Sequence, residues 1–282
     1  MNQLLIDSHT HTAFSPDAKD SLTAMCERAI ELGLYAYTVT DHCDCNFWDK
    51  TDDKDITDYM MYGAGEYALN SIKAQYEMKQ RLEGRLNFHV GIELGQPLQN
   101  IEKAEEIAAL PQLDLIIGSH HMNNGENDFY YLDYSSMTSS EIDKLLSDCF
   151  TQTLEMCRWG KFDVLGHLTY PLRYICGEHG IGIDISKYDE LIAEIFKTLI
   201  NSGKGIEINT SGLRQKYGLT FPDFKYIKLY KDLGGEIITT GSDAHCTADL
   251  AKGIPQGTEL ARQAGFEYIA YYKKHQPVFV RL

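Results

Sequence analysis

The chain has 282 residues, 43% of them hydrophobic, and a formal net charge of −15 at pH 7. A chain of this size can bury a large core, and α/β barrels of about 200–250 residues or more routinely form one domain, so we predict a single domain over residues 1–282. The negative charge would repel the phosphates of a nucleic acid, and no basic stripe offsets it, so no nucleic-acid partner is expected.

Neither a secreted protein nor a membrane protein is predicted. Residues 1–6 contain no basic region followed by an apolar stretch of signal-peptide length, and no run of about 18 apolar residues occurs in the chain. The seven cysteines are an odd number without a repeated metal-knuckle spacing, which argues against a secreted disulfide framework. We therefore expect a cytoplasmic protein with no membrane partner, and the sequence leaves its oligomeric state open.

Short apolar runs, often β-branched, alternate with helical patterns along the chain. The predicted strands cover residues 4–7, 35–40, 86–92, 113–118, 162–166, 205–209 and 236–240. The first predicted helix follows Asp20 or Ser21 and stops at Gly33, and the others cover residues 67–82, 101–110, 140–158, 188–201 and 223–233. Seven such units predict an α/β fold with a parallel sheet closed, or nearly closed, into a barrel, and residues 268–282 predict a strand pair outside it.

Histidines and carboxylates follow the predicted strands. The motifs are Asp7-Ser8-His9-Thr10-His11, Thr40-Asp41-His42, Gly91-Ile92-Glu93, Gly118-Ser119-His120, Gly166-His167 and Gly241-Ser242-Asp243-Ala244-His245. In a parallel barrel the carboxyl ends of the strands form the active-site face, so these side chains are expected to meet there. Imidazole and carboxylate groups bind zinc, manganese and iron, and this many ligands exceed what one ion can use. The pattern therefore predicts a multinuclear metalloenzyme.

Taken singly, these residues have simpler interpretations. His9 and His11 lie two positions apart on an extended segment, so their side chains leave the same face, but such pairs also occur at ordinary surfaces. Glu93 is also compatible with an ordinary acid at a strand end, and Asp243 with a turn former. His121 would point away from its neighbour in an extended segment, which leaves it as a candidate pocket residue.

Together the motifs resemble the polymerase and histidinol phosphatase (PHP) superfamily, in the family's order, over roughly residues 5–246. The resemblance implies a distorted (β/α)7 TIM-like barrel with three divalent metal ions (zinc, manganese or iron) at the C-terminal ends of the strands. It implies one ion held by His9, His11, Glu93 and Asp243, and a second held by Glu93, His120 and His167. It implies a third ion held by Asp17, His42 and His245. Asp17, within Phe14-Ser15-Pro16-Asp17, resembles the histidinol-phosphate phosphatase branch, since many relatives have histidine there.

Hydrolysis of a phosphate ester suits such a site. Clustered divalent ions lower the pKa of a bound water from about 15.7 towards about 7 and clamp the attacking and leaving oxygens. Arg173 and Arg214 each follow a predicted strand, and a planar guanidinium matches two phosphate oxygens at once. Both arginines are predicted to bind phosphate. Asp17 and His42 join them as candidate catalytic residues, with His42 also a candidate substrate contact.

The resemblance thus implies hydrolysis of L-histidinol phosphate to L-histidinol and phosphate, a step of histidine biosynthesis. One alternative keeps the fold and metals but acts on another small phosphate ester or a nucleotide. Another is a non-catalytic metal-binding module, which would predict missing ligands. Partners for the ammonium and imidazole of histidinol are expected within residues 43–62, which contain Asp44, Phe47, Trp48, Asp49, Asp52 and Asp53.

Overall fold

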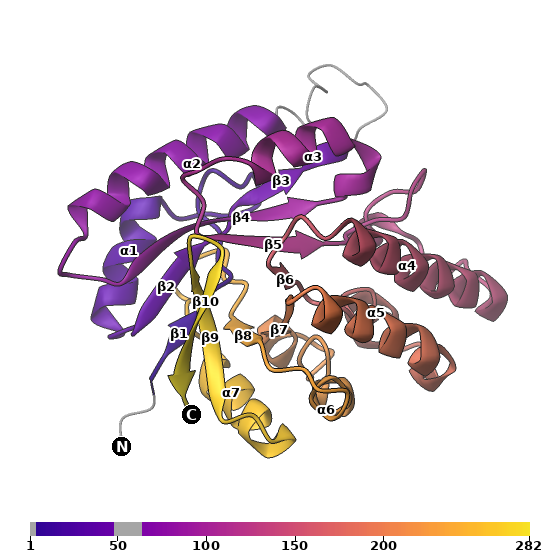
Figure 1. Ribbon diagram of the computed structural model, residues 1–282. Helices are drawn as coiled ribbons and strands as arrows, with labels where there is room; N and C mark the ends of the chain where they lie inside the picture. Colours follow the sequence, from indigo (N-terminus) through magenta and orange to yellow (C-terminus); the bar gives the residue numbers. More distant parts are fainter. Residues whose placement is uncertain (1–3, 48–63) are drawn as a thin grey trace.

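The computed structural model describes residues 4–47 and 64–282. Seven parallel strands form one sheet in the order β1-β2-β4-β5-β6-β7-β8. They are β1 (Ile6–Asp7), β2 (Ala36–Val39), β4 (Phe88–Gly95), β5 (Leu115–Ser119), β6 (Val164–Leu165), β7 (Gly205–Asn209) and β8 (Ile238–Gly241). The first and last strands also meet, because Ser8 N donates a hydrogen bond to Thr240 O at 2.9 Å. The sheet is therefore a nearly closed barrel, as predicted (Figure 1).

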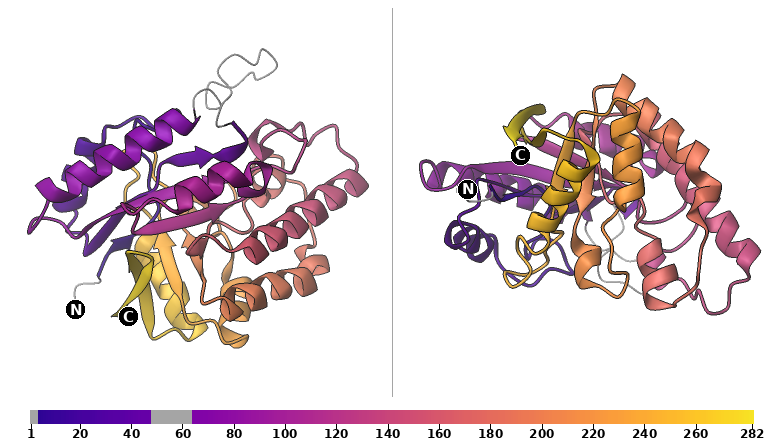
Figure 2. Two further views of the ribbon diagram at one scale, coloured as in Figure 1. Left: turned by 45° about the horizontal axis from the view of Figure 1, so that its top comes forward. Right: turned by 90° about the horizontal axis from the view of Figure 1, so that it is seen from below.

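Helices cover the outside of this barrel in both further views (Figure 2). They are α1 (Leu22–Glu31), α2 (Ala64–Arg81), α3 (Ile101–Ala108), α4 (Ser139–Trp159), α5 (Asp189–Asn201), α6 (Phe224–Asp232) and α7 (Ile254–Ala264). Helix α1 begins as its sequence predicts: the Ser21 side chain accepts a hydrogen bond from Ala24 N, and Leu22 and Met25 are buried. None of the helices within the described residues is long and apolar enough to cross a membrane.

The period-two alternation of strand side chains divides the core into two layers. In β5, Leu115 and Ile117 point into the barrel and pack with Val164, whereas Ile116 faces the larger core beneath the helices. This phase continues past the end of the strand and determines which of the following side chains reach the active-site face.

One strand and one α-helix of the described residues were not predicted. Strand β3 (His42–Asp44) pairs in parallel with the far half of β4, with His42 opposite Glu93. Helix α7 follows Gly253 at φ 81° and ends at Gly265 at φ 100°, and it has proline in its first turn. These are ordinary helix boundary signals that the sequence analysis did not use.

The predicted C-terminal strand pair is confirmed as the antiparallel hairpin β9 (Tyr268–Lys273) and β10 (Gln276–Arg281). It covers the N-terminal ends of the strands, where Tyr272 packs against Leu115 and Val164. At its turn, His275 Nδ1 lies 2.9 Å from Asp163 Oδ2. The hairpin thus closes the end of the barrel opposite the predicted metal site. The single domain over residues 1–282 stays a prediction.

Candidate metal centre

Strand register brings the predicted ligands to one end of the barrel. The pairing of β3 with β4 sets His42 beside Glu93, and a parallel bridge between Thr10 and Ala244 sets the His9 to His11 segment beside Asp243. Within the described residues, four groups of three side chains have ligand atoms close enough to share an ion. They are His9, His11 and Asp243; His9, Glu93 and His167; His11, His42 and His245; and His42, Asp44 and His121.

The first group has the spacing of a metal-binding set. His9 Nε2 and His11 Nε2 are 3.2 Å apart, and His11 Nε2 is 3.3 Å from Asp243 Oδ1. Ligand atoms held at about 2.0–2.1 Å by a tetrahedral zinc ion lie about 3.3–3.4 Å from each other. A second imidazole pair, His121 Nε2 and His167 Nε2, is 3.3 Å apart. These distances and donor types fit divalent metal ions.

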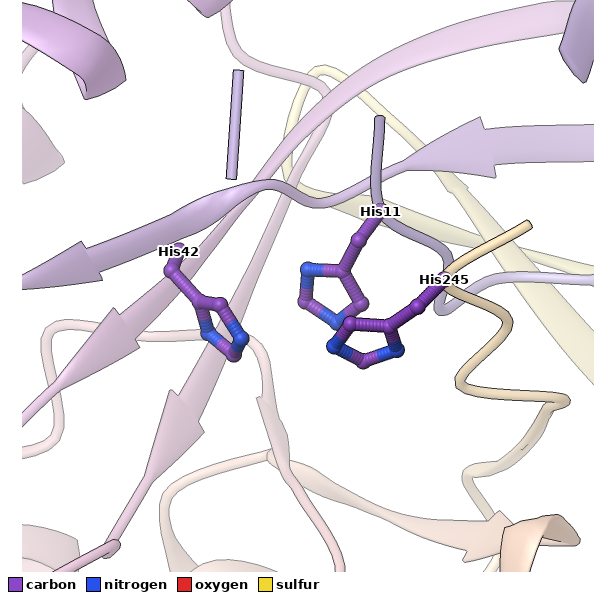
Figure 3. A group of neighbouring side chains, drawn as sticks. All are labelled: His11, His42 and His245. Atoms are coloured by element: carbon purple, nitrogen blue, oxygen red, sulfur yellow. The ribbon is translucent and has the colours of Figure 1, made fainter. Parts of the chain in front are cut away.

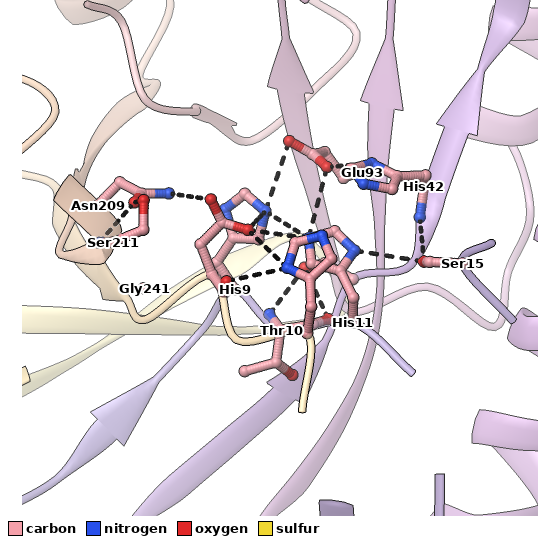
Figure 4. A network of polar contacts seen from close by, with 12 residues as sticks. His9, Thr10, His11, Ser15, His42, Glu93, Asn209, Ser211 and Gly241 are labelled. Atoms are coloured by element: carbon pink, nitrogen blue, oxygen red, sulfur yellow. Dashed lines mark hydrogen bonds and ion pairs between the residues drawn. The ribbon is translucent and has the colours of Figure 1, made fainter. Parts of the chain in front are cut away.

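Glu93 lies between two sets of imidazoles. Its Oε1 is 2.8 Å from His167 Nε2 and 3.4 Å from His9 Nε2, whereas its Oε2 is 2.6 Å from His42 Nδ1. The carboxylate is buried, and within the described structure Oε2 and His42 Nδ1 lack a hydrogen bond with suitable angles. Figure 4 shows this carboxylate among the histidines. Burial alone would raise the pKa of Glu93, but the surrounding imidazoles outweigh it and lower that pKa well below its usual range. Its position suits a ligand that bridges two ions.

The third predicted group also comes together. The ring of His11 lies 4.2 Å from those of both His42 and His245, measured between centroids (Figure 3). Asp17 Oδ2 is 2.8 Å from His245 Nε2 and 3.6 Å from His42 Nε2. Burial would raise the pKa of Asp17, but His42 and His245 lower it further than burial raises it. Its second oxygen is buried without a hydrogen-bond partner among the described residues, which suits a metal ligand.

His120 is the predicted ligand that the structure does not bring into the cluster. Its Nε2 is 3.0 Å from Asn123 Oδ1 and its ring packs beside Phe129, whereas His121 Nε2 lies 3.1 Å from Glu93 Oε1. The phase of β5 explains the difference. Ser119 points inward and donates a hydrogen bond to Glu93, so the next residue turns away and His121 turns back. The prediction that His120 is a metal ligand is therefore corrected, and His121 takes that role.

Further side chains that sequence reasoning missed hold the ligands in place. Glu207 Oε1 is 2.8 Å from His9 Nδ1, and its Oε2 accepts a hydrogen bond from His167 N. Ser15 Oγ contacts His11 Nδ1 and accepts from His42 N, as Figure 4 shows. Contacts of this kind fix ring orientation and tautomer. The sequence signal that could have identified Glu207 is an acidic residue in the middle of a strand expected to be buried.

The two arginines have different surroundings. The Arg214 guanidinium donates to the backbone oxygens of Ser242 and Asp243 at 2.6 and 2.7 Å, so it braces the segment that carries a predicted ligand. Arg173 lies over the Tyr174 ring, 5.1 Å from its centroid. Its buried Nε has no hydrogen-bond partner within the described residues, and its charge interacts with Asp243. Arg173 therefore has donor capacity left for an anion beside the cluster.

The chain has relatives among known proteins. The PHP domain family matches residues 7–211, so the chain belongs to that family. A probable histidinol-phosphatase of Thermotoga maritima is 26% identical, and the match covers 94% of this chain and 95% of the relative. A probable phosphatase of Photobacterium profundum is also 26% identical, with 99% and 93% covered. A crystal structure of histidinol phosphate phosphatase from Lactococcus lactis, complexed with zinc, L-histidinol and phosphate, has a TM-score of 0.74 at 21% identity and covers 97% of this chain and 98% of that one.

Proposed function

We propose that this protein is a metal-dependent phosphomonoesterase that hydrolyses L-histidinol phosphate to L-histidinol and phosphate, a step of histidine biosynthesis. The observation that carries the proposal is the buried Glu93 carboxylate, which lies between His167 and His11, together with Arg173, whose charge interacts with Asp243. The full-length match to a probable histidinol-phosphatase supports the choice of substrate. The cytoplasmic location stays a prediction.

The ligand atoms divide into three sets in this proposal. One ion is held by His9, His11, Glu93 and Asp243, a second by Glu93, His121 and His167, and a third by Asp17, His42 and His245. Zinc suits the imidazole-rich sets, and manganese and iron are the alternatives. When bound, the ions would supply Lewis-acid polarisation of the phosphate and an activated water.

The chain's own residues bind and orient the substrate. Arg173, whose buried Nε–H has no partner among the described residues, would donate to the phosphate oxygens, and charge developing on those oxygens would strengthen such a hydrogen bond. Arg214 stays a predicted phosphate ligand, and it also donates a hydrogen bond to the backbone oxygen of Asp243. His42 and Asp17 line the same face and keep their predicted catalytic roles, His42 also as a substrate contact.

One rival substrate class has a specific observation in its favour. The relative from Photobacterium profundum, which covers almost the whole chain, carries only the general name of a probable phosphatase. Another small phosphate ester or a nucleotide is therefore the second candidate. The test is steady-state hydrolysis of histidinol phosphate, an aryl phosphate and a nucleoside monophosphate by metal-replete protein. We expect the highest kcat/KM with histidinol phosphate, and a preference for the nucleotide would overturn the substrate assignment.

A further inference from the structure

The segment after β5 folds back onto a residue of the candidate metal centre. Phe129 N donates a hydrogen bond to His121 O at 3.0 Å, which returns the chain to a ligand of the cluster. Asp128, the residue before it, is partly buried, and its carboxylate interacts electrostatically with His121 and His42. An acidic side chain from outside the strand-end motifs is thus placed beside the site.

This carboxylate differs from the other acids there. Asp17 and Asp243 face imidazoles, and Asp44 accepts from Gln96 Nε2 and lies 3.2 Å from His121 Nδ1. Asp128 Oδ1 accepts one hydrogen bond, from Tyr130 N at 2.7 Å, and no cation pairs with it in the described part of the chain. A cation beside this partly buried carboxylate would offset part of the cost of burying its charge.

Two tyrosines connect this acid with the phosphate end of the site. The Tyr170 and Tyr174 hydroxyls are 2.6 Å apart, and the two rings that follow Asp128 pack against them: Phe129 lies 6.3 Å from Tyr170 and Tyr130 lies 5.8 Å from Tyr174, between centroids. Burial and the charge of Asp128 both raise the pKa of the two tyrosines. The Tyr170 ring lies 5.0 Å from that of His167, and the face of Tyr174 carries Arg173. The surface thus runs from a guanidinium, across aromatic rings, to an unpaired carboxylate. Such a polarity fits a ligand with an anionic and a cationic group, because aromatic faces also attract cations.

We propose that Asp128, with Tyr170 and Tyr174, binds the ammonium group of an amino-alcohol phosphate while Arg173 binds its phosphate. The assignment rests on the proposed function and adds to it the residue that selects the leaving group. The sequence predicts this role within residues 43–62, where Trp48, Asp49, Asp52 and Asp53 lie outside the described residues. Asp44, the described acid of that set, already contacts His121.

The test compares Asp128→Asn with the wild type on three esters: histidinol phosphate, the same ester without its amino group, and an aryl phosphate. Asparagine keeps an oxygen for Tyr130 N, so the local fold is retained, and thermal unfolding checks this. Asp133→Asn is the matched control, because Asp133 is an exposed acid of the same segment. We expect Asp128→Asn to lower kcat/KM for histidinol phosphate roughly ten- to a hundred-fold, as for loss of a charge-assisted hydrogen bond. The other two esters should be hydrolysed as by the wild type, and the control should match the wild type on all three.

Equal losses on both alkyl esters would overturn the proposal, because Asp128 would then act on the leaving oxygen rather than on the ammonium. Equal losses on all three esters would also overturn it. Calorimetric binding of L-histidinol and of its deamino analogue gives a readout without turnover. If the wild type prefers L-histidinol and this preference disappears in Asp128→Asn, the subsite is supported even when no phosphate ester is hydrolysed. Absence of turnover would refute the proposed function but not the subsite. Equal binding of the two alcohols by the wild type would overturn the subsite.

Discussion

Replacing Glu93 by glutamine tests the bridge at the centre of the site. Glu93 Oε1 lies 2.8 Å from His167 Nε2, in the set of the second proposed ion, and its Oε2 lies 3.7 Å from His11 Nε2, in the set of the first. One isosteric change therefore removes charge from both sets. A charge-assisted contact contributes about 1.5–3 kcal/mol, so losing one on each side costs about 3–6 kcal/mol. At about 1.4 kcal/mol per factor of ten, we expect kcat/KM to fall roughly 10²- to 10⁴-fold.

The assay is hydrolysis of an aryl phosphate and of histidinol phosphate, with metal content measured on the same samples. Glu93→Gln should lose bound metal as well as activity, because an amide is a weaker ligand than a carboxylate. The fold should persist, since the side-chain volume is unchanged. Glu105→Gln is the matched control, because Glu105 is a surface acid paired with Lys161. Near wild-type activity in metal-replete Glu93→Gln would refute the bridging role.

Three further outcomes are expected. Asp17→Asn should lower metal stoichiometry and activity, because Asp17 joins His42 and His245 through one oxygen, and unchanged values of both would remove it from the ligand set. Arg173→Ala should lower kcat/KM roughly ten- to a hundred-fold on every phosphate ester with metals retained, and full activity would contradict a phosphate contact. The hydrogen bond to Asp163 raises the pKa of His275 above its usual value, so this pair stabilises the fold below about pH 6.5 and the stabilisation is lost as pH rises through the raised pKa. His275→Asn should therefore reduce the urea midpoint more at pH 5.5 than at pH 9, and a loss independent of pH would refute this linkage.

The barrel was predictable because each of its strands carries a short apolar run, and the segments between these runs show helical spacing of apolar residues. The clustering of His9, His11, Glu93 and Asp243 followed from their shared position at strand ends. The sequence did not show directly which residues of β5 face into the barrel. Counting alternation from the inward Ile117 would have selected His121 over His120, but which residues face inward became clear only from packing against Val164.

Other parts of the site depend on contacts between segments far apart in the sequence. Glu207 supports His9 across 198 positions of the chain, and no local pattern encodes that pairing. Asp128 lies in an irregular segment without strand or helix periodicity, so its approach to His121 depends on the hydrogen bond from Phe129. Roles that depend on how a loop returns to the barrel could not be predicted from periodicity.

Anomalous diffraction from crystals of the metal-loaded protein tests the central claim most directly. If Glu93 bridges two ions, their peaks should lie about 3.5–4 Å apart, as in other two-metal hydrolytic sites. His121 and His167 should be ligands of one of these ions, and His9 and His11 of the other. A single isolated peak, or ions too far apart to share the carboxylate of Glu93, would contradict the account.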